Sequence, residues 1–243
     1  MKRRRAVRAT NRASEKREGR TSGEHYRAGY QAGYALGLRL GQEDRDSVFE
    51  GTSIIIPVDP HHDEAIQAIQ HIEATTPHLY EVLVADAGAA TNTRRYILER
   101  SGAVRHIKGN SGESLAHVVN KAMSVSLGEY IAILANASPN LDNWLGILTG
   151  ELERKPVVKI VYAGSKAAGL AAAANAENPA LPASGSEYVL SCLLFRRSLP
   201  SEIGMWPEAN RSVEEHMSHW LERVPAQERL QAEASSLFVS RKL

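Results

Sequence analysis

The chain has 243 residues, of which 43% are hydrophobic and 23% are charged, and its formal net charge is +1. This composition excludes wholesale disorder and a collagen-like chain, and the length suits one large domain with an appendage. The sequence has no run of about 18 apolar residues, so no transmembrane helix is expected, and its single cysteine excludes an internal disulfide and fits a reducing compartment.

Basic charge is concentrated at the N-terminus. Residues 1–20 contain nine Lys or Arg and two Glu, a net charge of +7, which leaves −6 for the rest of the chain. We expect residues 1–24 to be a disordered basic tail that keeps the protein soluble or contacts the periphery of a membrane. No aromatic residue is interleaved with these charges, which argues against nucleic-acid binding. The tail lacks the apolar core of a secretory signal, and this predicts a cytoplasmic location.

A glycine repeat follows the tail. Within residues 26–41 a glycine recurs at every fourth position, at Gly29, Gly33, Gly37 and Gly41. On a helix these glycines form a bare stripe that allows another backbone to approach closely. We therefore predict a helix over residues 25–47, whose residues 26–41 bind a protein partner or a second copy of the chain. A flexible glycine-rich linker is the alternative that the sequence leaves open.

Residues 48–243 alternate β-branched runs with amphipathic segments. Strands are predicted at 52–58, 81–86, 104–108, 130–135, 157–162 and 188–197. Helices are predicted at 63–75, 91–100, 115–123, 141–152 and 211–223. Residues 163–187 are interpreted as a long variable loop, and Ser114 as a helix N-cap. Strands that alternate with helices indicate an α/β domain with a doubly wound, mostly parallel sheet, which binds ligands at the carboxyl ends of its strands.

Several short phrases of this body follow one another in a distinctive order and spacing: TSIIIPV (52–58), EVLVADAG (81–88), Asn110-Ser111-Gly112, Asn120 before Gly128-Glu129-Tyr130, LSCLLFRR (190–197), EIGMW (202–206) and VEE (213–215). With these phrases, residues 52–224 resemble family 2 glycosyltransferases, which have the GT-A fold. The resemblance implies an enzyme that holds a nucleotide-sugar donor over the strand ends. It transfers the sugar, with inversion, to a hydroxyl of a glycan or another acceptor. A bacterial cell-surface glycan pathway is the setting that the resemblance suggests.

The resemblance also implies roles for particular residues. Asp86 falls on the aspartate that binds the nucleobase, and Glu215, preceded by Glu214, falls on the carboxylate that deprotonates the acceptor. Trp206 and His219 are expected on the acceptor side. The other positions expected to bind the nucleotide sugar are Pro57, Asp59, Asn110, Gly112 and Asn136.

The chain departs from the family at the metal-binding motif. Where the family has aspartates after the fourth strand, this chain has Ala135-Asn136-Ala137-Ser138. Mn²⁺ and Mg²⁺ prefer charged oxygen ligands, so no metal site is predicted, and transfer is expected to be metal-independent or weakened. The alternative hypothesis is a catalytically inactive GT-A-like protein that binds partners through its N-terminal helix.

Each of the main candidates also has a simpler interpretation. Asp86 can cap a turn, and Glu215 can be a solvated carboxylate at the start of a helix. His216 and His219, three residues apart, can ligate a transition metal or form a partly exposed helix face. Trp206, like the other two tryptophans, can belong to the core.

Overall fold

The computed structural model describes residues 33, 49–61, 63–135, 137–139, 141–166, 188–232 and 238–240. The chain divides into two units, Met1–Ser47 and Val48–Leu243. The predicted basic tail and glycine-repeat helix lie outside the described residues, except for Gly33, which is helical and exposed.

The second unit alternates strands with helices in the order that the sequence predicted. Its strands are β1 (Phe49–Val58), β2 (Tyr80–Asp86), β3 (Val104–Lys108), β4 (Gly128–Leu134), β5 (Ala137–Pro139), β6 (Ile160–Lys166), β7 (Tyr188–Arg196), β8 (Arg229–Gln231) and β9 (Phe238–Ser240). Its helices are α2 (Ala65–Thr75), α3 (Thr91–Glu99), α4 (Leu115–Ser124), α5 (Trp144–Arg154), α6 (Leu199–Ile203), α7 (Val213–Leu221) and the 3₁₀ turn Ala226–Glu228. None of the helices in the described ranges has the length and apolar character that spanning a bilayer requires.

Seven of the strands form one sheet, in the order β3-β2-β1-β4-β7-β6-β8. The pairs β1–β2, β1–β4, β2–β3 and β6–β8 are parallel, whereas β7 runs antiparallel to both of its neighbours. A small second sheet pairs β5 with β9 in antiparallel fashion. The expectation of a mostly parallel α/β sheet is confirmed.

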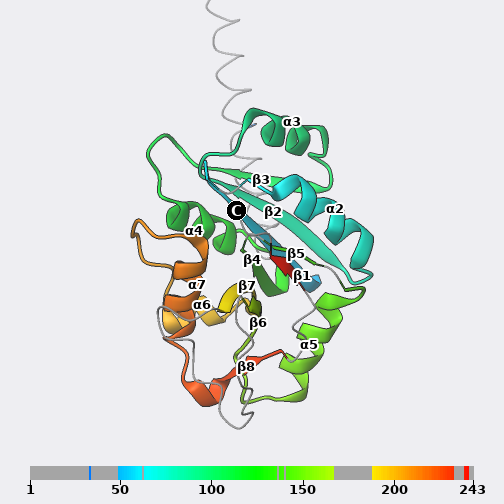
Figure 1. Ribbon diagram of the computed structural model, residues 1–243, viewed down its shortest axis with the longest axis vertical. Helices are drawn as coiled ribbons and strands as arrows, with labels where there is room; N and C mark the ends of the chain where they lie inside the picture. The colour runs from blue at the N-terminus through cyan, green and yellow to red at the C-terminus, as the bar shows by residue number, and fades with distance from the viewer. Residues whose placement is uncertain are drawn as a thin grey trace, which may run out of the picture. The chain divides into compact units, whose positions relative to one another are not determined.

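Helices cover both faces of the main sheet, as Figure 1 shows, with α2 and α5 on one side and α4, α6 and α7 on the other. The first layer packs Ile69, Ile72 and Leu148 against one face of the sheet. The second packs Val118, Met217 and Trp220 against the opposite face. Because both faces are covered, the central strands are largely apolar, and the run from Ile54 to Val58 is buried.

Some elements differ from the sequence prediction. The strand predicted at 157–162 runs from Ile160 to Lys166, because the chain turns at Lys155–Val158 and leaves Val157 64% exposed. The prediction of a loop from residue 163 is therefore wrong for 163–166, and residues 167–187 lie outside the described residues. The short elements α6, β5, β8 and β9 were not predicted, because three to five residues carry too little periodicity.

Gly128 begins β4 where the backbone of β1 leaves no room for a side chain. A Cβ atom at this position would lie 2.6 Å from the backbone nitrogen of Ser53 and 2.8 Å from the carbonyl oxygen of Gly51. We expect Gly128→Ala to lower the free energy of unfolding by roughly 1–3 kcal/mol, the usual cost of overpacking. Gly150→Ala is the matched control, because a Cβ there, in the interior of α5, meets nothing within 4 Å. It should raise stability by roughly 0.5–1 kcal/mol. Equal urea midpoints for the two variants would contradict this packing.

Candidate functional site

The register of the parallel strands brings their carboxyl ends to one edge of the sheet. Val58 at the end of β1 pairs with Asp86 at the end of β2, and Asp86 pairs with Lys108 at the end of β3. This carboxyl edge is the place where open α/β sheets bind ligands. These three strand-end residues mark the candidate site.

Asp86 is the most extensively bonded carboxylate of this edge, and its side chain is fully buried. Its oxygens accept hydrogen bonds from the backbone nitrogens of Gly88 (2.9 Å) and Ala89 (2.6 Å) and from Nε of Arg94 (2.9 Å). Nε2 of His106 lies 2.9 Å from the same carboxylate. Burial raises the pKa of this carboxyl, but the hydrogen bonds outweigh it and hold the pKa well below its usual range. The carboxylate is therefore a fixed negative charge.

These contacts give Asp86 a structural task. It closes the turn between β2 and α3, as the simpler interpretation proposed, and it also joins α3 to β3 through Arg94 and His106. Its role on a nucleobase stays a prediction, since a base would have to share oxygens that protein donors already use. Arg94 itself reaches the surface, because its side chain is 41% exposed.

The other residues that were predicted to bind the donor differ in how exposed they are to solvent. Pro57 is buried within β1, and Asp59 is half-buried and accepts a hydrogen bond from the backbone of His61 at 2.7 Å. Asn110 is exposed, and its side-chain amide donates to Glu113 at 2.6 Å. Gly112 adopts a φ of +84°, which favours glycine in the turn before α4. The structure brings Asn110 and Gly112 together in this turn, while Asn136 lies outside the described residues.

A charged network that the sequence did not indicate lies at the start of α4. Nζ of Lys121 is 2.6 Å from Glu113, and Nδ1 of His117 is 3.1 Å from Glu208. Hydrogen bonds from Lys121 and Asn110 lower the pKa of Glu113 to about 2. The network links α4 to the segment that precedes α7. Glu113 and His117, four residues apart, were a local signal for part of it, whereas Glu208 lies ninety-one residues from His117.

The two glutamates of the resemblance lie in the first turn of α7. Glu215 is exposed and completes a capping box: its Oε2 accepts from the backbone nitrogen of Ser212 at 2.9 Å, and its own nitrogen donates to Oγ of Ser212 at 3.2 Å. Glu214 beside it is half-buried. The cap explains why a glutamate suits this position in the helix. Oε1 of Glu215 makes no hydrogen bond to a residue that the structure describes.

Trp206, which was expected on the acceptor side, lies in the core. Only 2% of the residue is exposed, and its ring stacks on His216 with centroids 5.1 Å apart and an interplanar angle of 9°. The side-chain amide of Asn120 holds its backbone, accepting from its nitrogen at 3.0 Å and donating to its oxygen at 2.9 Å. This placement offers no ring face to a sugar and fits the interpretation of Trp206 as a core residue.

The two histidines of α7 do not behave as a pair. His216 is fully buried, so the idea of a partly exposed face is wrong for it, and burial lowers its pKa. Its Nε2 lies 3.2 Å from the carbonyl oxygen of Ala209. His219 is half-buried, and its expected contact with an acceptor stays a prediction.

Two residues after β4 carry no side chain that could ligate a divalent metal. Ala135 and Ala137 have methyl groups in place of oxygen ligands. Within the described ranges, which omit Asn136 and the side chain of Ser138, no group of three or more His, Cys, Asp or Glu is placed to hold a metal ion.

Comparison with known proteins identifies the fold. No protein-family model matches the sequence, and no curated protein is similar to it in sequence. A structure of S. aureus TarS, residues 1–349, matches over 76% of this chain with a TM-score of 0.54 and 16% identity. Glucosyl-3-phosphoglycerate synthase from Mycobacterium tuberculosis, in complex with Mn²⁺, UDP-glucose and phosphoglyceric acid, matches over 80% of this chain with a TM-score of 0.56 and 13% identity.

These matches confirm the GT-A fold that the resemblance implied. The chain spans 59% of the first TarS structure, 36% of a longer one and 73% of the synthase. At these identities the likeness concerns the arrangement of the backbone. The assignment of individual site residues rests on this chain's own geometry.

Proposed function

We propose that the protein is a glycosyltransferase that takes its sugar from a nucleotide-sugar donor held over the carboxyl edge of the sheet. The GT-A arrangement of the seven-stranded sheet is the observation that carries this proposal. One of the similar structures contains UDP-glucose, which makes a UDP-sugar the first donor to test. The links of α4 to Glu208 and Trp206 support a shared site, because they tie the donor-side helix to the segment that leads into α7.

Glu215 is the proposed base. Its Oε2 is held by the cap, so Oε1 is the atom available to an acceptor hydroxyl. The carboxylate lies in the first turn of α7, where the Ser212 N–H holds one of its oxygens in place. Oε1 takes the hydroxyl proton as the acceptor oxygen bonds to the anomeric carbon. The bond from that carbon to the diphosphate breaks, and the nucleoside diphosphate leaves with the electron pair.

The departing diphosphate needs positive charge, and the carboxyl edge offers two basic side chains for it. Lys108 is exposed at the end of β3, and it forms no ion pair within the part of the chain that the structure describes. Arg94 balances Asp86 but remains 41% exposed. We assign to Lys108 the larger share of this task, because its charge is not already used by a carboxylate.

A screen of nucleotide sugars tests the proposal. We expect one UDP-sugar to raise the melting temperature and to be hydrolysed or transferred slowly, with the same rate in Mn²⁺ and in EDTA. Turnover that requires Mn²⁺ would contradict the metal-independent part of the proposal. A chain that neither binds nor turns over any donor would be the catalytically inactive alternative.

A further inference from the structure

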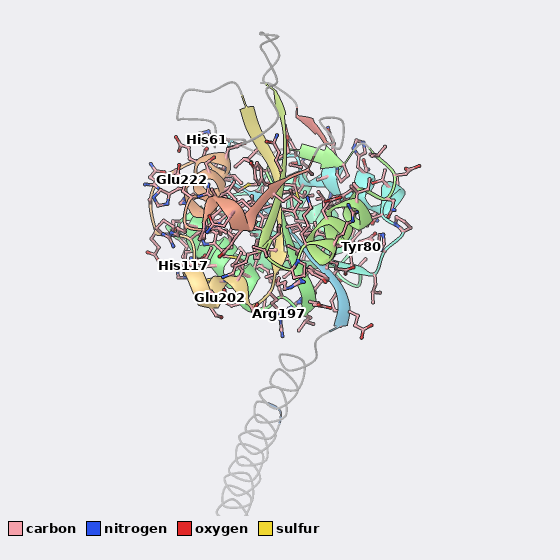
Figure 2. All side chains as sticks on the ribbon, turned by 90° about the horizontal axis from the view of Figure 1, so that it is seen from below. His61, Tyr80, His117, Arg197, Glu202 and Glu222 are labelled. Atoms are coloured by element: carbon pink, nitrogen blue, oxygen red, sulfur yellow. The ribbon has the colours of Figure 1, made fainter. Side chains whose placement is uncertain are left out.

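Residues 204–211, the connecting segment, join α6 to α7 without forming a helix or a strand. The polar groups of such a backbone must be satisfied by other parts of the molecule. Helices α4 and α7, which pack against the same face of the sheet, supply several of these partners. Figure 2 shows His117 of α4 and Glu222, which follows α7, on one side of the unit, away from Tyr80 at the start of β2. The connecting segment is therefore held by two helices.

Helix α7 holds the connecting segment mainly through His216, which is fully buried. The ring of His216 stacks on that of Trp206, and its Nε2 lies 3.2 Å from the carbonyl oxygen of Ala209. Because a carbonyl oxygen can only accept, Nε2 carries the proton of this hydrogen bond. One turn later on α7, Nε1 of Trp220 donates to the carbonyl oxygen of Gly204 at 2.7 Å. The connecting segment and the first two turns of α7 thus pack as one piece.

Helix α4 holds the same segment through Asn120. The side-chain oxygen of Asn120 accepts from the backbone nitrogen of Trp206 at 3.0 Å, and its amide nitrogen donates to the backbone oxygen of Trp206 at 2.9 Å. Two hydrogen bonds to one residue fix both its position and its orientation. His117 adds a contact of 3.1 Å to Glu208, but their side chains are 40% and 70% exposed, so this pair contributes little.

We propose that Asn120 is a positioning residue, which fixes the first turn of α7 and with it the carboxylate of Glu215. The route is short, because Asn120 holds Trp206, and Trp206 stacks on His216, the residue that follows Glu215. The inference rests on the proposed function, which makes Glu215 the base. A base must lie within hydrogen-bond reach of the hydroxyl that it deprotonates, and a misplacement of about 1 Å can slow a reaction about a hundredfold.

Asn120→Asp tests this role. The substitution keeps an oxygen that accepts from the Trp206 nitrogen, but it replaces the amide donor with an oxygen that repels the Trp206 carbonyl. The rate measured is the release of UDP from the UDP-sugar that the nucleotide-sugar screen identifies, with water as the acceptor. We expect this rate to fall by about tenfold or more at saturating donor, while the donor affinity stays within about twofold. Ser124→Ala is the control, because the exposed Ser124 bonds only to the backbone oxygen of Asn120, and its rate should stay within about twofold of wild type.

The same substitution in the Glu215→Gln background separates positioning from general loss of structure. Two residues that act through one base are not additive, so Asn120→Asp should change the residual rate of Glu215→Gln by less than about twofold. An equal loss in both backgrounds, or full activity of Asn120→Asp, would overturn the inference. If Asn120→Asp melts more than about 5 °C below wild type, Asn120→Ala replaces it in every measurement, since alanine removes both hydrogen bonds without adding a charge.

Hydrogen exchange of the full chain tests the link to α7 without any turnover. The backbone nitrogens of Glu215 and His216 donate to Ser212 in the first turn of α7. Asn120→Asp should speed the exchange of these two amides by about tenfold or more and that of Ile147, in α5, by less than about twofold. Unchanged exchange in α7 would overturn the inference, even where wild type transfers sugar and the proposed function stands. If no donor is turned over, the proposed function fails, and the exchange alone decides whether Asn120 fixes this turn.

Discussion

Glu215→Gln is expected to abolish sugar transfer while leaving the fold intact. General-base catalysis contributes about 10²–10⁴ to a rate, so transfer should fall by at least a hundredfold. Glutamine keeps an oxygen that can accept from the Ser212 N–H, and glutamine is a normal partner in a capping box. Donor affinity should stay within about twofold, because the lost proton acceptor faces the acceptor hydroxyl.

Ser212→Ala is the control that separates catalysis from capping. It removes the hydroxyl that accepts from the Glu215 nitrogen but leaves the carboxylate in place. We expect it to cost about 1 kcal/mol of stability and to retain most of the transfer activity. If Glu215→Gln stays fully active, or if Ser212→Ala loses as much activity as Glu215→Gln, Glu215 is a helix cap and another group is the base.

Asp86→Asn is expected to give a large loss of stability. The substitution removes the charge that balances Arg94. The amide oxygen can still accept from the backbone nitrogens of Gly88 and Ala89, but an NH₂ donor then replaces the oxygen that accepts from Nε of Arg94. The cost should be roughly 2–4 kcal/mol, toward the lower end because Arg94 is partly solvated. Asp142→Asn, at an exposed position before α5, should change stability by less than about 0.5 kcal/mol.

The same carboxylate makes stability depend on acid. The pKa of Asp86 is lower in the folded chain than in the unfolded chain, so its contribution is complete above the unfolded value, about 4, and is lost as the pH falls below it. The difference in unfolding free energy between wild type and Asp86→Asn should therefore be constant from pH 7 to pH 5 and narrow below pH 4. Urea titrations at these pH values measure it. A difference that stays unchanged down to pH 3 would contradict the buried charge network.

Long elements were predictable because their patterns are local. The apolar run of β1 predicts a strand covered on both faces, and the spacing of Val118 and Val119 predicts the buried face of α4. Ser114 is confirmed as the N-cap of α4, since its hydroxyl accepts from the nitrogen of His117. The antiparallel direction of β7 carries no such signal, because it shows only in the pairing with β4 and β6, whose residues are distant in the sequence.

The partners within the site were not predictable, because they are joined by the fold and not by sequence spacing. Asp86 meets His106 across twenty residues, and Asn120 meets Trp206 across eighty-six. The stacking of Trp206 on His216 likewise forms only when the segment between α6 and α7 packs against α7. A polar residue at a strand end can therefore be recognised in the sequence as a candidate site residue. Its role depends on which side chains contact it in the folded chain.

The central claim is tested most directly by calorimetry. The nucleotide sugar that raises the melting temperature most is titrated into wild type, Lys108→Met and Arg197→Met. The claim is that the nucleotide sugar binds at the carboxyl edge, so Lys108→Met should weaken the affinity by about tenfold or more. Arg197, next to the start of β4, lies at the opposite, amino edge of the sheet, and Arg197→Met should leave the affinity within about twofold of wild type. Donor binding that Arg197→Met weakens and Lys108→Met leaves unchanged, or no heat from any nucleotide sugar with any of the three proteins, would contradict it.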